Sequence, residues 1–218
     1  MRKLIINLKT YEESTGERAV EIAKICKKLE DQAKAKDVEI IICPQIIDIR
    51  EIIQLGIKVY TQHMDNYNYG AHTGFTIPQA LKDAGVSGTL ISHSEHRLKI
   101  SEIEEELNTA KKLGLETCVC ARNANKASEV AKLSPDFVAI EPKELIGGNI
   151  SISTAEPELI EDSIKAVGNI PLLVGAGIKN TQDVRKGIEY GAKGILVASG
   201  VIKAQNIEET ILELLNGF

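Results

Sequence analysis

Two residues able to move protons stand directly after apolar runs of the sequence. His93 follows the run 88–92, and Glu141 follows the run 137–140. An imidazole changes charge near neutral pH, and a carboxylate against an apolar wall is costly to ionise, which suits it to work as a general base. Each residue also has a structural interpretation, because lone histidines are mostly structural and loop glutamates are mostly capped or salt-bridged. Acid–base chemistry follows only if the fold brings both together.

Asn7 and Lys9 place two more polar groups at the end of the first apolar run, 3–8. Side chains alternate along a strand, so Ile5, Asn7 and Lys9 share one face. Alone, these residues are better explained by a solvated lysine and an asparagine bonded to a loop. With His93 and Glu141 at other strand ends, we interpret them as parts of one catalytic site.

Two glycine-rich segments follow later apolar runs: Gly175-Ala176-Gly177-Ile178 and Ala198-Ser199-Gly200-Val201. Backbone amides of such loops commonly bind phosphate after the last two strands of a barrel. The alternative is a pair of tight turns, which glycine suits equally well. Their position favours a phosphate site.

Eight short apolar runs alternate with amphipathic segments, as in parallel strands covered by helices. In 218 residues each unit has about 27 residues, close to the minimum for a strand, a loop and a helix. We therefore predict an α/β fold, a (β/α)8 barrel in one domain over residues 1–218. An open doubly wound sheet is the alternative, but its GxGxxG motif is absent after the first strand. The predicted strands are 3–8, 38–43, 57–61, 88–92, 115–120, 137–140, 170–174 and 194–198.

Helix ends are marked by capping residues and by periodicity. Ser101 with Glu104 and Asn206 with Glu209 form capping-box patterns, and Pro157 suits a first helical turn. A further set shares one helical face that we expect to pack on the sheet: Ile103, Leu107, Ala110 and Leu113. Another set suits left-handed helix ends before the next strand: Gly56, Gly85, Gly114, Gly168 and Gly191.

Composition excludes several classes of protein. The net charge of -5 argues against a broad nucleic-acid or membrane footprint. No stretch approaches the ~20 apolar residues of a spanning helix. The four cysteines fit neither a CxxC motif nor zinc spacing, so we expect small buried apolar residues in a soluble, cytoplasmic protein.

Taken together, the motifs resemble those of the triosephosphate isomerase family in its short archaeal form. The resemblance spans the chain and rests on Asn7-Leu8-Lys9, Gln62-His63, Ala71-His72-Thr73-Gly74, His93-Ser94-Glu95-His96-Arg97, Ile140-Glu141-Pro142, Leu145-Ile146-Gly147, Gly175-Ala176-Gly177-Ile178 and Ala198-Ser199-Gly200. It implies a TIM barrel that interconverts dihydroxyacetone phosphate and glyceraldehyde 3-phosphate, a reaction of glycolysis and gluconeogenesis, with no cofactor and no metal.

The resemblance also implies a role for each matching residue. Glu141 would carry a proton between adjacent carbons through an enediolate, and a neutral His93 would donate a hydrogen bond to it, in front of a short helix that begins near Ser94. Lys9 and Asn7 would bind substrate and add electrostatic support. Glu95 would lie behind these residues, out of contact with the substrate, and hold them in position.

Phosphate would be held by backbone amides near five residues: Ile146, Gly147, Gly177, Ala198 and Ser199. Ile146 and Gly147 would belong to a lid that closes over the substrate. The lid departs from the family pattern, because the usual Gly-Thr-Gly reads Gly147-Gly148-Asn149 here. That difference bears on hinge stiffness and closing rate more than on the reaction.

The segment 70–74 resembles the family's interdigitating loop, in which Thr73 would reach a neighbouring subunit's site; an exposed loop is the alternative. The resemblance thus implies a homo-oligomer, a tetramer in preference to a dimer. Two rival functions remain: a Schiff-base aldolase that uses Lys9 as its nucleophile, and a sugar-phosphate-binding barrel without catalysis.

Overall fold

Eight parallel strands close into one barrel, in the order in which they follow along the chain. The computed structural model describes residues 1–142 and 157–218. The strands are β1 (Arg2–Asn7), β2 (Val38–Cys43), β3 (Lys58–Thr61), β4 (Gly88–Ile91), β5 (Glu116–Ala121), β6 (Phe137–Ile140), β7 (Leu172–Val174) and β8 (Gly194–Val197). All eight predicted strands are present within two residues of their expected bounds, and the predicted barrel is confirmed.

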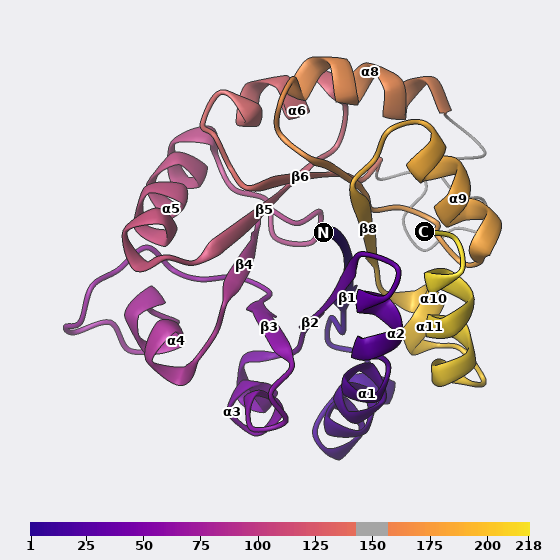
Figure 1. The fold of residues 1–218 in the computed structure, drawn as a ribbon. Coiled ribbons are helices and arrows are strands. Elements are labelled where there is room, and N and C mark those ends of the chain that lie inside the picture. Colours follow the sequence, from indigo (N-terminus) through magenta and orange to yellow (C-terminus); the bar gives the residue numbers. More distant parts are fainter. Residues whose placement is uncertain (143–156) are drawn as a thin grey trace.

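Helices form an outer ring around the strands (Figure 1). They are α1 (Glu17–Lys28), α2 (Glu30–Lys34), α3 (Ile49–Ile53), α4 (Pro78–Ala84), α5 (Ile100–Leu113), α6 (Ala124–Ala131), α8 (Pro157–Val167), α9 (Thr181–Glu189), α10 (Ser199–Ile202) and α11 (Ile207–Leu215), with short 3-10 turns at Glu12–Ser14 and Ile46–Asp48. The five glycines predicted at helix ends all have positive φ, so the sequence marks these boundaries correctly.

Two of the three predicted helix starts are confirmed. Asn206 accepts a hydrogen bond from the Glu209 amide at 3.2 Å, and Pro157 is the first residue of α8. The start expected at Ser101 is wrong, because α5 begins at Ile100 and its capping glutamate is Glu102, which accepts from the Lys99 amide at 2.6 Å.

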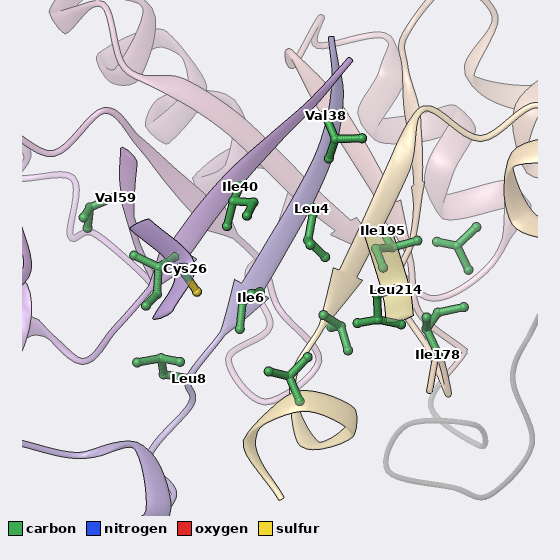
Figure 2. Close-up of a cluster of buried hydrophobic side chains, with 14 of the residues drawn as sticks. Leu4, Ile6, Leu8, Cys26, Val38, Ile40, Val59, Ile178, Ile195 and Leu214 are labelled. Carbon is green, nitrogen blue, oxygen red and sulfur yellow. The ribbon is translucent and has the colours of Figure 1, made fainter. Parts of the chain in front are cut away.

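The pleat of β1 separates two buried clusters. Leu4 and Ile6 face the helices, in a cluster that includes Cys26 of α1 and Leu214 of α11 (Figure 2). Ile5 faces the barrel interior with nine further residues: Ile41, Cys43, Tyr60, Leu90, Cys118, Cys120, Ala139, Leu173 and Leu196. The alternation places Asn7, two residues after Ile5, on the inner face as well. All four cysteines are buried and unbridged, as predicted.

Charged residues close the amino-terminal end of the barrel. Lys58 on β3 bridges Glu39 on β2 at 3.0 Å and Glu116 on β5 at 2.9 Å. Lys3 on β1 also pairs with Glu39, and the Tyr60 hydroxyl donates to Glu116. The polar residues predicted to act on a substrate lie instead beyond the opposite, carboxyl ends of the strands.

Candidate active site

A pocket opens at the carboxyl ends of the strands. It brings together side chains and loops that are far apart in the sequence, and the strand ends that carry them converge because the barrel is closed. Its lining includes Asn7, Lys9, His93, Glu141, Gly175, Gly177, Ile178, Lys179, Ala198, Ser199 and Gly200. The predicted catalytic and phosphate-binding residues of the described chain therefore share one pocket.

Glu141 stands at the base of this pocket, directly after β6. Its amide donates to the Ala121 carbonyl of β5 at 2.8 Å, which fixes the backbone, and the residue is only 3% exposed. Its Oε2 is buried without a hydrogen-bond partner among the described residues.

Gly175 and Cys120 both lie next to Glu141: the glycine leaves space for the carboxylate, and the cysteine is an uncharged neighbour. A Cβ at position 175 would lie 2.5 Å from Glu141 Cγ, so only glycine leaves room for this carboxylate. Burial raises the pKa of the Cys120 thiol, and the negative charge of Glu141 raises it further, so the thiol stays protonated and adds no second anion.

His93 faces Glu141 across the pocket, with its Nε2 3.5 Å from Glu141 Oε1. The Glu95 amide donates to its Nδ1 at 3.2 Å. A neutral imidazole with Nδ1 as acceptor carries its proton on Nε2, so the hydrogen-bond pattern directs an N–H donor toward Glu141.

The short helix expected at Ser94 is not formed. Residues 94–96 form a turn in which the His96 amide donates to the His93 carbonyl at 2.9 Å, and the helix begins later, at Ile100. The reason is that Ser92 and Arg97 close the segment locally: Ser92 Oγ accepts from the Leu98 amide, and Arg97 donates to the Ser92 carbonyl at 2.8 Å. The imidazole ring of His93 therefore accepts a hydrogen bond from the backbone amide of Glu95 and does not lie at the amino terminus of a helix.

Lys9 is held in an uncommon backbone conformation beside His93. Its φ is 51°, in the left-handed region that residues with a side chain rarely adopt. Asn7 Oδ1 accepts from the Lys9 amide at 3.0 Å, and Lys9 Nζ lies 2.7 Å from Glu95 Oε1. The Lys9 side chain is only 10% exposed, so the solvated alternative for Lys9 is wrong. Glu95 contacts both Lys9 and His93, in the supporting place predicted for it.

Gln62 was given no role by the sequence, although it belongs to a quoted motif. Its Nε2 donates to the Lys9 carbonyl at 2.9 Å and to the Cys43 carbonyl at 3.0 Å. The side-chain amide of Gln62 therefore connects Lys9, whose backbone is left-handed, to Cys43 at the end of β2. The available signal was the rule already applied to His93 and Glu141, since Gln62 directly follows β3.

The glycine-rich loops line the other end of the pocket. The N–H groups of Gly177, Ser199 and Gly200 donate to no group within the described part of the chain. Gly177 has a φ of 70°, and a Cβ at Gly200 would lie 2.5 Å from the Ile178 carbonyl oxygen, so both positions require glycine. Unbonded amides that converge on a pocket suit an anionic oxygen.

The predicted lid residues cannot be compared with the structure. Ile146, Gly147, Gly148 and Asn149 lie outside the described residues. Within residues 1–142 and 157–218, no group of three or more histidine, cysteine, aspartate or glutamate residues could hold a metal ion. No helix in the same ranges is long and apolar enough to cross a membrane.

The segment predicted to interdigitate lies between β3 and α4 and reaches out from the barrel (Figure 1). Thr73 is exposed and directly follows His72, on whose ring Tyr67 stacks with ring centroids 4.5 Å apart. Phe75, half exposed, contacts Tyr67 edge-on. The exposure fits both interpretations of this loop.

Comparison with known proteins agrees with the geometry. The family model described as triosephosphate isomerase matches residues 2–215. A triosephosphate isomerase of Methanocaldococcus jannaschii is 48% identical over 217 residues, which cover 97% of this chain and 98% of the relative. Those of Methanobacterium bryantii and Methanobrevibacter smithii are 42% and 40% identical, each over 98% of this chain. The chain therefore belongs to the triosephosphate isomerase family in its short archaeal form and is an enzyme of the isomerase class.

Proposed function

We propose that this protein interconverts dihydroxyacetone phosphate and D-glyceraldehyde 3-phosphate through an enediolate. The observation that carries the proposal is a buried carboxylate and an imidazole that face each other at 3.5 Å, in a pocket also lined by glycine-rich loops whose amides make no hydrogen bond within the described residues. A triose phosphate has matching parts: two adjacent oxygenated carbons for the acid–base pair, and a phosphate for the amides.

Glu141 acts as the base that carries the proton. It removes a proton from carbon 1 of dihydroxyacetone phosphate, the two electrons of the broken C–H bond form the C1–C2 double bond, and the C2=O π pair moves to oxygen 2. Glu141 then returns the proton to carbon 2, while the hydroxyl proton of oxygen 1 is transferred to oxygen 2 and leaves the C1 aldehyde. Its Oε2 has no donor to satisfy among the described residues. The Glu141 carboxylate therefore need not break a hydrogen bond at Oε2 before it accepts the substrate's proton.

His93 and Lys9 stabilise the charge that develops on the substrate oxygens. The Nε2–H of His93 points into the gap before Glu141, where an oxygen of the enediolate would lie. Lys9 brings an ammonium to the same pocket, with Asn7 fixing its backbone. Donors and charges placed before the reaction are a main source of catalysis in sites that exclude water.

The phosphate is bound by amides of Gly177, Ala198 and Ser199, helped by the neighbouring Gly200. All four residues line the pocket. Ile146 and Gly147 complete this set in our proposal, in a lid that excludes water and suppresses loss of phosphate from the enediolate.

The deciding experiment is NMR of dihydroxyacetone phosphate in deuterated water with the purified protein. We expect glyceraldehyde 3-phosphate to form and solvent deuterium to enter the carbon skeleton. Absence of both signals would reject the proposed function and favour a binding protein. Borohydride trapping tests the aldolase alternative. Lys9 Nζ lies 2.7 Å from Glu95 Oε1, so we expect no covalent adduct, whereas a labelled Lys9 would overturn the isomerase mechanism.

We further propose that residues 1–218 form one domain and that the protein is a cytoplasmic homo-oligomer, a tetramer in preference to a dimer. Exposed apolar residues support an interface, since Ile46, Ile47 and Phe75 line one surface groove and are 49%, 72% and 50% exposed. Analytical ultracentrifugation distinguishes four, two and one subunits, and a monomer at micromolar concentration would contradict the assembly.

A further inference from the structure

We propose that Ser92 is a positioning residue for His93: its left-handed backbone and its hydroxyl group together hold the imidazole in the tautomer that donates a hydrogen bond from Nε2. This inference rests on the proposed function, in which that N–H stabilises the enediolate. Ser92 is buried and is not among the residues that line the pocket, so it acts through its neighbours and not on the substrate.

The backbone of Ser92 breaks the alternation of β4. Leu90 belongs to the cluster inside the barrel, and Ile91 belongs to the cluster that faces the helices. A strand that continued with a period of two would therefore turn His93 toward the helices. Ser92 instead has a φ of 56°, in the left-handed region that residues with a side chain rarely adopt, and His93 lines the pocket. The strained residue thus lies where the chain is redirected into the active site.

The hydroxyl group of Ser92 holds the turn that follows. Ser92 Oγ accepts a hydrogen bond from the Leu98 amide at 3.2 Å, six residues later in the sequence. Between these two residues, the Glu95 amide donates to His93 Nδ1 at 3.2 Å. Arg97 donates to the Ser92 carbonyl, a bond that remains available when the side chain at position 92 is changed. Loss of the hydroxyl should therefore loosen the turn without unfolding it and shift the Glu95 amide relative to the imidazole.

The position of the Glu95 amide matters because two carboxylates compete for the single proton of a neutral His93 ring. Glu95 Oε2 lies 3.6 Å from Nδ1, and Glu141 Oε1 lies 3.5 Å from Nε2. These distances differ little, so the carboxylates alone do not select a tautomer. The Glu95 amide selects it, because a donor directed at Nδ1 requires an unprotonated nitrogen there. When the amide moves away, the Nδ1–H tautomer becomes accessible, and its Nε2 has no proton to donate to the enediolate.

Ser92→Ala and Ser92→Gly both remove the hydroxyl group and differ in backbone strain. Glycine adopts a left-handed conformation without steric cost, so Ser92→Gly should unfold at a higher urea concentration than Ser92→Ala. With dihydroxyacetone phosphate, we expect kcat to fall about tenfold or more in both variants, since small misplacements of a catalytic group cost up to about 100-fold. KM and inhibition by inorganic phosphate should stay within about twofold of wild type, because the affected hydrogen bond forms only in the transition state.

The second measurement is the tautomer of His93, observed by 15N NMR of protein with labelled histidine. The chain has four histidines, and the signals of His93 are those missing from His93→Gln. Wild type should show the Nε2–H form, and both Ser92 variants should show an additional Nδ1–H form. A general loss of stability does not change the tautomer of one ring, so this result separates positioning from a purely structural role.

Ser134 provides the matched control, because it is a serine with the same φ of 56° that precedes β6, at the amino ends of the strands. Ser134→Ala and Ser134→Gly should differ in stability in the same sense but keep the kcat and the His93 tautomer of wild type. A wild-type kcat in Ser92→Gly, or an unchanged tautomer in both Ser92 variants, would refute the proposal. Failure of the isomerase function is separate, because it would appear as no turnover by wild type, whereas the tautomer is measured without turnover.

Discussion

The role proposed for Glu141 depends on the few atoms around one carboxyl group. Gly175 leaves it room, and Cys120 remains a neutral neighbour. His93 Nε2 lies 3.5 Å from Oε1, and Oε2 has no hydrogen-bond partner among the described residues. A carboxylate this buried is unfavourable for stability, which is typical of residues retained for chemistry.

Replacing Glu141 by glutamine tests this role directly. Glutamine keeps the shape but cannot accept a proton, so we expect turnover of Glu141→Gln to fall about 10²-fold or more while the protein stays folded. Steady-state kinetics and circular dichroism measure the two effects. Glu104→Gln, the same change at an exposed position of α5, should leave both unchanged. Near-normal turnover of the Glu141 variant would remove this residue from the mechanism.

At the scale of elements, Gln62 joins the ends of β1, β2 and β3. Its two hydrogen bonds hold the carbonyls of Lys9 and Cys43, although Lys9 is in the left-handed region. We infer that Gln62 positions Lys9. Such strained residues persist only where their surroundings hold them in place.

Gln62→Glu replaces the donor by an acceptor that faces two carbonyl oxygens. Each lost bond costs about 1–3 kcal/mol when buried groups are left unpaired, so we expect kcat/KM to fall about tenfold or more at pH 8. A protonated glutamic acid can donate again, so the ratio of variant to wild-type kcat/KM should rise as pH falls. Gln79→Glu makes the same change at the start of α4 and should do neither. A pH-independent ratio would argue against the positioning role.

Helix α5 carries an acid on the face predicted to be apolar. Glu106 is 3% exposed, and its Oε2 has no partner among the described residues. Burial, with the negative charges of Asp65 and Glu102, raises its pKa from 4.5 to about 8. Between pH 4.5 and about pH 8, the Glu106 carboxyl is therefore protonated in the folded protein but ionised in the unfolded chain. Stability from this group is fully present below pH 4.5 and is lost as pH rises to about 8.

Glu106→Gln should therefore stabilise the protein at pH 8 and not at pH 4.5. We expect a gain of about 2 kcal/mol or more at pH 8, since one pKa unit corresponds to about 1.4 kcal/mol. Urea unfolding of both proteins across this range measures the difference. Glu105→Gln, the exposed neighbour, is the control. Parallel stability curves would show that Glu106 is ionised in the folded protein.

At the scale of the whole molecule, the sequence predicted what periodicity and strand order determine. Apolar runs separated by helices indicated all eight strands, and closure of the barrel then placed His93 and Glu141 in one pocket. Glycines marked helix ends because a left-handed φ is a local property. The roles within the pocket came from the family resemblance, since spacing alone left structural alternatives open.

What the sequence did not predict depends on contacts between distant segments. The turn after His93 is closed locally by the bond from Arg97 to the Ser92 carbonyl at 2.8 Å, and Arg97 also joins it to β5 through the Cys120 carbonyl at 3.0 Å. The bonds made by Gln62 and the burial of Glu106 depend on how neighbouring units pack. No local pattern carries such information, and a helical face that includes a glutamate reads as solvated.

Closure of the barrel depends on one seam, where β8 pairs with β1 from Lys3 and Gly194 to Ile6 and Val197. A Cβ at Gly194 would lie 2.1 Å from the Lys3 carbonyl oxygen, so alanine there must push the strands apart. We expect Gly194→Ala to lower the free energy of unfolding by about 3 kcal/mol or more, measured by the urea midpoint. Because Lys9 and Ser199 follow the two strands of the seam, isomerase activity should be lost at a correspondingly lower temperature.

Gly187→Ala is the control variant. Gly187 lies within α9, and its new methyl group would meet Val174 at 3.3 Å, so this change should alter stability by about 1 kcal/mol or less. Equal midpoints for the two variants would mean that the seam opens without cost, and that β1 and β8 are not what holds the two ends of the pocket together.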